Sequence, residues 1–156
     1  MSFGEHVIQL NDAREMPLLG LGVYKATEDA ELKQAIGDAV SFGYHLIDTA
    51  SFYKNEEGIG KALKTLSIPR EDLFITTKIW NTAQRIGDIE DSFHRSLERL
   101  GLDYVDLYLI HWPVPGCFCD TWHAMEKLQA QGKIKSIGVS NFSIQDLETL
   151  MASTDI

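Results

Sequence analysis

The sequence predicts an α/β fold in which about five parallel strands alternate with helices and follow a β-hairpin. Apolar, strand-like runs recur about every 30 residues, which is the length of one strand, loop and helix with a right-handed crossover. Amphipathic segments separate these runs, and three of them end at a glycine just before the next run. The length of 156 residues favours a single domain, residues 1–156, with the hairpin at 6–17 and the βα units at 18–156.

The first predicted element is the hairpin. Residues 7–10 and 11–16 form two short runs around an Asn-Asp turn at Asn11 and Asp12. Turns of this kind join antiparallel strands. The hairpin is therefore expected to stand before the repeating units.

The repeating units come next, with strands predicted at 18–23, 44–47, 73–77, 106–110 and 135–139. The intervening helices are predicted because apolar residues recur at i, i+3, i+4 and i+7. Glycine ends them well because it accepts the left-handed C′ conformation without strain. The stripes are Leu32, Ala35, Ile36, Ala39 and Val40 before Gly43; Ile89, Phe93, Leu97 and Leu100 before Gly101; and Trp122, Met125 and Leu128 before Gly132. A last helix is predicted from Ile144 to about Leu150.

Periodicity alone leaves the winding of the sheet open. An open doubly wound sheet and a (β/α)8 barrel both repeat βα units, and a complete barrel needs about 250 residues. Two glycine-rich stretches do not decide the matter. Gly20-Leu21-Gly22 lacks the third glycine of a dinucleotide fingerprint, and the stretch from Gly58 to Lys61 lacks the upstream glycine and the Ser/Thr of a P-loop.

Composition excludes several classes of function. A net charge of -9 argues against nucleic acid as a partner, because phosphate binding needs a basic surface. The N-terminus lacks the pattern of a secretory signal and no apolar run is long enough to span a membrane, so a cytoplasmic location and no membrane partner are expected. Cys117 and Cys119 are expected to be free thiols in a loop, and no further Cys or His pair completes a metal site.

Four polar residues follow the strand-like runs and are the candidate catalytic residues: Asp48, Tyr53, Lys78 and His111. In a parallel α/β protein the active site lies where strands end. A tyrosine with a pKa of about 10 needs a nearby cation to act in proton transfer, and Lys78 could supply it while pairing with Asp48. His111 could then orient a substrate oxygen. Taken singly, each residue also has a structural interpretation: Asp48 as a helix N-cap, Tyr53 and Lys78 pointing to solvent, and His111 in the core.

Five stretches in order resemble the aldo-keto reductases. They are MPLLGLGVYK at 16–25, GYHLIDTASFYKNE at 43–56, TTKIW at 76–80, GLDYVDLYLIHWP at 101–113 and IGVSNF at 137–142. The resemblance implies a (β/α)8 barrel, here a partial barrel of about five strands. It also implies an NADPH-dependent enzyme, with NADH as the less frequent cofactor, that reduces aldehydes or ketones such as small carbonyls, keto-sugars or dicarbonyls.

The resemblance also assigns roles to residues. Asp48, Tyr53, Lys78 and His111 match the family's tetrad, with Tyr53 as the general acid. Residues matching its cofactor site are Val23, Tyr24, Lys25, Asp48, Ser140 and Asn141, and those matching its substrate site are Tyr24, Phe52, Trp80, His111 and Trp112. Aromatic residues at strand ends also commonly fill cores.

Relative to the family pattern, the sequence lacks the last three strands and the basic loop that would grip the adenosine phosphates. We therefore expect a truncated barrel with two unpaired sheet edges, prone to self-association. The activity of the 156 residues alone stays open. Two other hypotheses are an inactive half-barrel that works by association with itself or another chain, and the inert product of a broken reading frame.

Overall fold

The computed structural model describes residues 6–155. Residues 1–5, on which most of the prediction about a secretory signal rests, and residue 156 lie outside the described residues. The strands are β1 (Val7–Gln9), β2 (Glu15–Pro17), β3 (Gly20–Gly22), β4 (Leu46–Asp48), β5 (Phe74–Ile79), β6 (Val105–Ile110) and β7 (Ile134–Val139). The helices are α1 (Asp29–Ser41), α2 (Glu56–Leu63), α3 (Asn81–Ile86), α4 (Ile89–Leu100), α5 (Phe118–Ala130) and α6 (Ile144–Met151), and two 3-10 turns are η1 (Ser51–Tyr53) and η2 (Arg70–Asp72).

The predicted α/β class, the hairpin and the sheet of five parallel strands are confirmed. Strands β1 and β2 pair antiparallel, and the sheet order β3-β4-β5-β6-β7 follows the chain, with every neighbouring pair parallel. A doubly wound sheet would reverse its order at a switch point. The sequential order is that of a singly wound, barrel-type sheet, which answers the question that periodicity left open.

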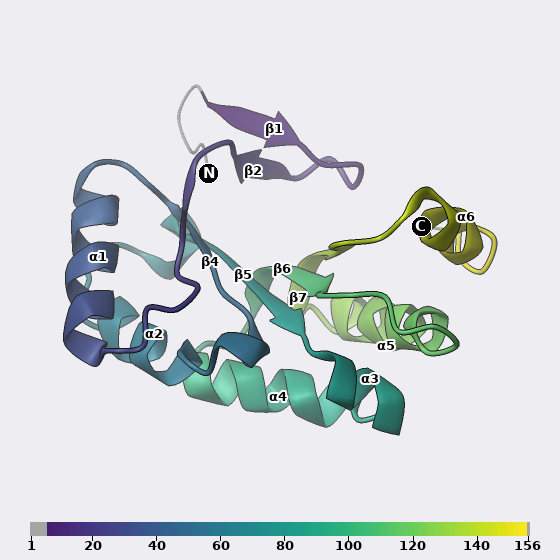
Figure 1. Cartoon of the computed structure of the whole chain (residues 1–156). Helices are drawn as coiled ribbons and strands as arrows, with labels where there is room; N and C mark the ends of the chain where they lie inside the picture. Colours follow the sequence, from purple (N-terminus) through teal and green to yellow (C-terminus); the bar gives the residue numbers. More distant parts are fainter. Residues whose placement is uncertain (1–5, 156) are drawn as a thin grey trace.

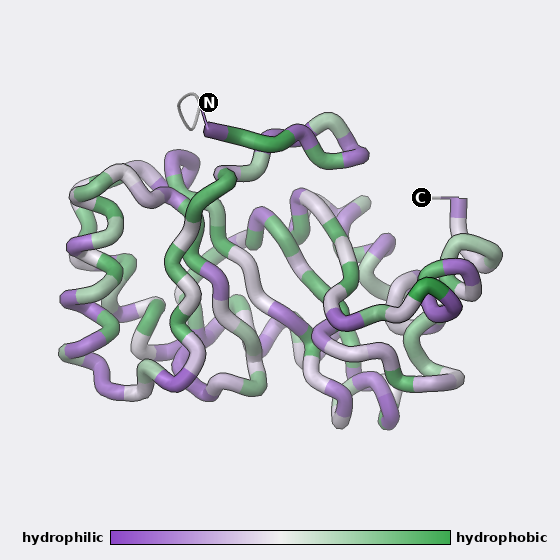
Figure 2. The backbone as a smooth tube through the Cα atoms, turned by 45° about the horizontal axis from the view of Figure 1, so that its top comes forward, coloured by the Kyte–Doolittle hydropathy of each residue, from purple (hydrophilic) through white to green (hydrophobic). Residues whose placement is uncertain are grey.

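The helices follow the curvature of the sheet along one side, and the hairpin crosses the end where the strands begin (Figure 1). The hydroxyl of Ser136 in β7 donates to Asp12 of the hairpin at 2.7 Å, which fixes the hairpin at that end. Hydrophobic and hydrophilic residues alternate along the helical segments (Figure 2), as expected when one helix face is buried. The opposite end of the sheet, where the strands end, is left for the candidate site.

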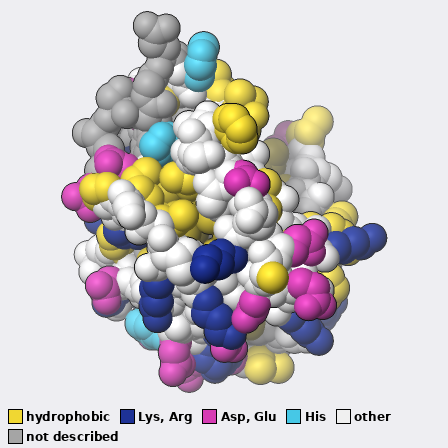
Figure 3. All heavy atoms as spheres, turned by 90° about the vertical axis from the view of Figure 1, so that its left-hand side faces the viewer, with side chains coloured by type: hydrophobic (Ala, Val, Ile, Leu, Met, Phe, Trp, Pro, Cys, Tyr) yellow, Lys and Arg dark blue, Asp and Glu magenta, His cyan; other side chains and the backbone are white. Residues whose placement is uncertain are grey.

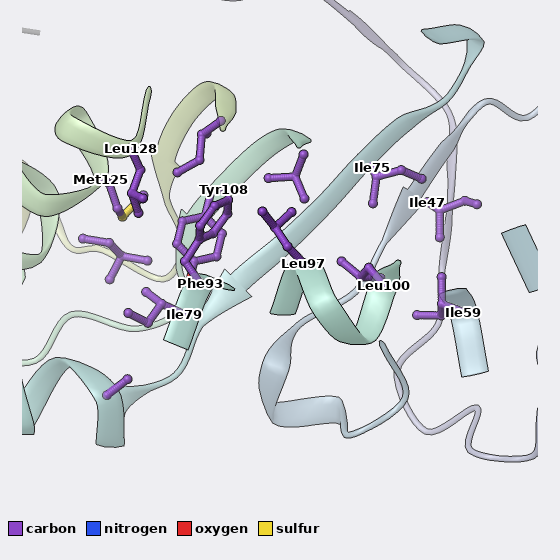
Figure 4. Close-up of a cluster of buried hydrophobic side chains, with 14 of the residues drawn as sticks. Ile47, Ile59, Ile75, Ile79, Phe93, Leu97, Leu100, Tyr108, Met125 and Leu128 are labelled. Carbon is purple, nitrogen blue, oxygen red and sulfur yellow. The ribbon is translucent and has the colours of Figure 1, made fainter. Parts of the chain in front are cut away.

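The core lies between the helices and the sheet. Phe93 of α4 and Tyr108 of β6 are fully buried and meet edge to face, with ring centroids 4.8 Å apart. Figure 4 shows these two side chains close to Leu97 and next to strand β5. Burying such aromatic and aliphatic side chains contributes about 1.5–3 kcal/mol each, so this layer holds the sheet that positions the site.

A buried polar network joins α2 and α4 to the sheet. The carboxylate of Glu56 accepts hydrogen bonds from the Thr77 hydroxyl at 2.7 Å and from the Arg99 guanidinium at 2.6 and 2.8 Å. The two helices also approach closely at Gly60, where an added Cβ would lie 2.6 Å from the backbone oxygen of Arg99. Since Thr77 precedes Lys78, the network also fixes β5 beside the candidate site.

The predicted helix ends are confirmed. Gly43, Gly101 and Gly132 have φ of 85°, 64° and 74°, the left-handed conformation that favours glycine after a helix. Two other points differ from the prediction. Helix α3 was not predicted, because six residues are too short for an apolar stripe, and Cys119 lies inside helix α5 rather than in a loop. Both cysteines are free thiols.

Strands β3 and β7 lie at the two edges of the five-stranded sheet, each with one neighbouring strand among residues 6–155. Several apolar side chains on the α1 side of the molecule are exposed, among them Leu18, Leu19 and Phe42. Figure 3 views this side and shows hydrophobic side chains gathered in its upper part, with acidic and basic side chains interspersed below.

Candidate active site

The register of the sheet brings two of the predicted site residues together. Asp48 of β4 pairs with Thr76 of β5, and Lys78 lies two residues further along β5. Side chains two residues apart on a strand point to the same face. Asp48 and Lys78 therefore share the face of the sheet that the helices do not cover.

Lys78 is held by two acceptors. Its Nζ donates to Asp48 Oδ1 at 2.6 Å and to the backbone oxygen of Thr49 at 2.9 Å. The Lys78 side chain is 8% exposed and that of Asp48 is 34% exposed. Asp48 thus serves as the counter-ion of a nearly buried ammonium, and its alternative role as a helix N-cap does not apply, since η1 follows Ala50.

Tyr53 closes the 3-10 turn that follows β4. This turn is tied to β5 by the Ser51 hydroxyl, which donates to the backbone oxygen of Lys78 at 2.9 Å. The Lys78 ammonium lies 5.3 Å from the centre of the Tyr53 ring. Burial raises the pKa of the Tyr53 phenol above its usual 10, and the charges of Asp48 and Tyr24 raise it further. The cation was expected to favour the phenolate; here Asp48 offsets its charge, and the phenol keeps its proton at neutral pH.

His111 follows β6 directly and completes the group. The face shared by Lys78 and Leu109, which pair in register, also carries His111, two residues after Leu109. The imidazole lies edge-on to Tyr53, with ring centroids 5.6 Å apart. Burial lowers the pKa of His111 below 6.5, the Lys78 charge lowers it further, and Asp48 opposes both. Within residues 6–155 its Nδ1 is buried without a hydrogen-bond partner. The lowered pKa leaves the ring neutral at pH 7.

A cavity of about 230 Å³ opens beside this group. Phe52 and Trp80 form one wall, stacked with ring centroids 3.9 Å apart, and His111 lies 5.1 Å from Trp80. The full lining comprises Tyr24, Phe52, Tyr53, Trp80, His111 and Trp112. The structure thus gathers every predicted substrate-site residue around one small, mostly aromatic space.

The predicted cofactor residues flank the same end of the sheet. Asn141, in a left-handed conformation with φ of 62°, donates to the backbone oxygen of His111 at 2.9 Å and to the Ser140 hydroxyl at 3.0 Å. On the other side, the backbone N–H of Val23 donates to the backbone oxygen of Asp48 at 3.2 Å, and the ring of Tyr24 lies 4.8 Å from that of Tyr53. The side chain of Lys25 lies over the Tyr24 ring at 5.4 Å.

Three buried polar residues at this end were not singled out from the sequence: Thr49, Asn55 and Gln84. Gln84 of α3 donates to the backbone oxygen of Trp112 at 3.0 Å and so joins two loops that wall the cavity. Thr49 and Asn55 bond to each other at 2.8 Å. Asn55 also bonds to Val23 and Ala26, which lie 32 and 29 residues away, and Trp112 lies 28 residues from Gln84, so no local pattern could have indicated these bonds.

The sequence of this chain matches a known protein family. The model of the aldo/keto reductase family matches residues 18–156. The chain belongs to the aldo/keto reductase family. This confirms the resemblance carried by the five sequence stretches.

The similar proteins include named carbonyl reductases. The chain is 48% identical over 149 residues to glyoxal reductase of Bacillus subtilis (strain 168), covering 96% of this chain and 54% of that protein. It is 50% identical over 152 residues to methylglyoxal reductase DkgA of Escherichia coli (strain K12), with the same coverage. The crystal structure of an aldo/keto reductase from Brucella melitensis superposes with a TM-score of 0.91 at 47% identity, over 96% of this chain and 59% of that one.

The chain spans about half the length of the curated relatives it matches, 54% for both named reductases. Among the described helices, none is both long and apolar enough to cross a bilayer. Residues 6–155 also contain no group of three or more His, Cys, Asp or Glu side chains arranged to hold a metal ion.

Proposed function

We propose that this site reduces small aldehydes and dicarbonyls with NADPH, with NADH as the alternative cofactor, and that Tyr53 is the general acid. The observation that carries the proposal is that Tyr53 and His111 line one aromatic cavity of about 230 Å³, while Lys78, paired with Asp48, places its ammonium 5.3 Å from the Tyr53 ring. Perturbed titratable groups that meet in a cavity are typical of catalytic sites. Membership of a family of carbonyl reductases supports the same chemistry.

The proposed roles follow from protonation. The raised pKa of Tyr53 keeps its phenol protonated, so it can give a proton to a carbonyl oxygen. When bound, the nicotinamide cofactor supplies the hydride for the carbonyl carbon. The carbonyl thus gains one hydride and one proton and becomes an alcohol. The nearby Lys78 ammonium stabilises the negative charge that develops as Tyr53 loses its proton, and Asp48 holds that ammonium in place.

His111 would orient the substrate. A neutral imidazole has one N–H donor, and the lowered pKa of His111 keeps the ring neutral at pH 7. Because Nδ1 is buried with no partner among the described residues, we assign the proton to Nε2, which leaves a donor for the carbonyl oxygen. Because both residues line the same cavity with ring centroids 5.6 Å apart, one carbonyl oxygen bound there could receive both groups.

The residues at this end fit the nicotinamide part of the cofactor. The Nδ2 of Asn141 is used by His111 and Ser140, while its Oδ1 accepts no hydrogen bond within residues 6–155. A carboxamide needs one acceptor for its NH₂ and one donor for its oxygen. Asn141 Oδ1 and the Ser140 hydroxyl would supply them, with Val23, Tyr24 and Lys25 along the other side.

The substrate class rests on cavity size and on the relatives. A cavity of about 230 Å³ is below the usual range of about 300–1,000 Å³ for drug-sized ligands. Two similar proteins are named glyoxal reductase and methylglyoxal reductase. We therefore propose small dicarbonyls as substrates, with aldehydes and keto-sugars as the wider class.

The test is NADPH consumption by the 156-residue chain with methylglyoxal, compared with Tyr53→Phe. Loss of general acid catalysis is worth about 10²–10⁴-fold, so Tyr53→Phe should lose at least a hundredfold in kcat. A matched control is Tyr44→Phe, which removes a hydroxyl from a residue outside the cavity lining. Equal rates for Tyr53→Phe and wild type would refute the role of Tyr53.

A second candidate function is association through the sheet edges. Strands β3 and β7 each have one paired side within the described part of the chain, and unpaired edges favour pairing with another chain. Light scattering over a range of concentrations tests this proposal. A monomer at every concentration, with the carbonyl reductase activity present, would leave the enzyme as the single function.

A further inference from the structure

Asn55 is a buried amide that ties together three segments of the site. Its side-chain Nδ2 donates to the backbone oxygens of Val23 at 2.8 Å and Ala26 at 2.9 Å, and its Oδ1 accepts from the Thr49 hydroxyl at 2.8 Å. The residue is 3% exposed. Val23 and Ala26 lie in the turn after β3, whereas Thr49 and Asn55 lie at the two ends of the connection from β4 to α2.

The chemistry of the partners fixes the orientation of this amide. Backbone oxygens only accept hydrogen bonds, so the NH₂ group must face Val23 and Ala26. The oxygen then faces the hydroxyl of Thr49, which must donate. Aspartate has the same shape but would offer no donor to the two carbonyls at neutral pH.

Asn55 does not cap helix α2 with its side chain, although it occupies the N-cap position. It stands at the N-cap of α2, where asparagine usually accepts a hydrogen bond from the first turn of the helix. Its side chain makes no such capping bond. The amide is used for the loop instead of the helix, so stabilising α2 is not its role.

The tied loop is a strained turn. The backbone N–H of Ala26 donates to Val23 at 3.2 Å, with Tyr24 and Lys25 as the central residues. Lys25 has a φ of 68°, the left-handed region that a residue with a Cβ adopts at a cost. Such a conformation persists where surrounding contacts hold it, and Asn55 binds the carbonyls at both ends of this turn.

The hydrogen bonds of Asn55 also connect it, through Thr49, to the candidate catalytic residue Lys78. Thr49 uses its hydroxyl for Asn55 and its backbone oxygen for Lys78 Nζ, at 2.9 Å. One continuous set of hydrogen bonds therefore runs from Lys78 through Thr49 and Asn55 to the turn that carries Tyr24 and Lys25. It connects the proton-transfer group to the turn on the predicted cofactor side.

We propose that Asn55, supported by Thr49, is a positioning residue that holds the turn at 23–26 in the shape that receives the nicotinamide cofactor. This inference rests on the proposed function. Its consequence is selective: loss of the amide weakens cofactor binding and leaves the rate of the bound complex nearly unchanged. Asn55 acts through the turn and does not touch the reacting atoms.

The experiment compares five proteins as full 156-residue chains: wild type, Asn55→Asp, Thr49→Val, Thr49→Ser and Gln129→Glu. Gln129→Glu is the matched control, because Gln129 also donates its amide to a backbone oxygen, that of Lys135 at 2.9 Å, at the other end of the sheet. Two readouts are used: amide hydrogen exchange of the segment 20–30, and NADPH titration with steady-state kinetics on methylglyoxal. Circular dichroism establishes that each variant is folded.

Removing donors from buried carbonyls is expected to change the equilibria by about tenfold or more. Asn55→Asp should therefore exchange at least about tenfold faster at 23–26 and raise KM for NADPH about tenfold, with kcat within about threefold of wild type. Thr49→Val should show the same pattern more weakly. Thr49→Ser, which keeps the hydroxyl, and Gln129→Glu should resemble wild type in both readouts.

Unchanged exchange at 23–26 in Asn55→Asp and Thr49→Val overturns the inference. So does a fall in kcat with no change in KM, because that would place Asn55 in the chemistry. If Asn55→Asp does not fold, Thr49→Val against Thr49→Ser decides alone. If wild type neither binds NADPH nor reduces methylglyoxal, the proposed function fails, while exchange at 23–26 still decides whether Asn55 holds the turn.

Discussion

The pair formed by Asp48 and Lys78 offers a measurable interaction energy that needs no enzyme assay. The perturbation is a double-mutant cycle of Asp48→Asn and Lys78→Met, which replaces each charge with a neutral group of similar size. The cycle isolates the pairwise energy because effects that each substitution has elsewhere cancel. One bond, from Lys78 to the backbone oxygen of Thr49, is lost equally on both sides of the cycle.

The magnitude follows from the geometry. At the 2.6 Å separation, two unit charges in an effective dielectric of about 20 attract by about 6 kcal/mol. Desolvation opposes this by several kcal/mol, since the Lys78 side chain is only 8% exposed. Asp48 is 34% exposed and keeps part of its hydration and screening. We therefore expect a coupling energy of about 2 kcal/mol, in the range of charge-assisted hydrogen bonds.

The assay is urea denaturation followed by tryptophan fluorescence, which gives the free energy of unfolding of all four proteins. A second cycle on the exposed pair Lys61 and Asp29, 2.9 Å apart, is the control, and its coupling should be much smaller. A coupling for Asp48 and Lys78 below about 0.5 kcal/mol, or no larger than that of the control pair, would refute the account of a mutually supporting pair.

Three further predictions concern stability. The pKa of His111 is lowered in the folded state, so unfolding binds protons and the free energy of unfolding should fall as pH drops below about 6.5; a His111→Gln curve that falls in parallel with wild type contradicts this. Gly60→Ala should lower the free energy of unfolding by about 1–3 kcal/mol, because its Cβ would lie 2.6 Å from a backbone oxygen of α4. Gly37→Ala, in open space within α1, should raise the free energy of unfolding by about 0.5–1 kcal/mol. Similar urea midpoints for those two variants would count against the close packing of α2 and α4. Phe52→Ala should lower the free energy of unfolding by about 1 kcal/mol, because the Phe52 ring stacks on Trp80. Phe42→Ala should lower it much less, because Phe42 is 81% exposed. Equal decreases for the two variants would show that the stack contributes nothing to stability.

Much of the fold could be predicted from local pattern. The stripes ending at Gly43, Gly101 and Gly132 indicated helices correctly, because a 3.6-residue apolar period and a left-handed glycine are both local properties. Helix α3 escaped prediction because its six residues carry no such period. The strand predicted at 18–23 is paired only at Gly20–Gly22, because strand length depends on the neighbour and not on apolarity alone.

The candidate site divides in the same way. The sequence could predict that the four polar residues at strand ends lie in one site, because successive parallel strands end at the same edge of a sheet. The titration of Tyr53 could not be predicted. Lys78 lies near its ring, yet Asp48 offsets that charge and burial dominates, so the pKa of the phenol rises.

By itself the sequence determined the family, the alternation of strands and helices, and the identity of the residues that could carry proton chemistry. The tertiary structure decided the winding of the sheet, which periodicity alone left open, and only it decided the contacts of buried polar atoms. The bonds of Asn55 cross 32 and 29 residues to Val23 and Ala26. The physical reason is that a periodic pattern specifies which face of an element is buried, whereas a hydrogen bond between distant segments depends on how the packed elements place two particular atoms within about 3 Å.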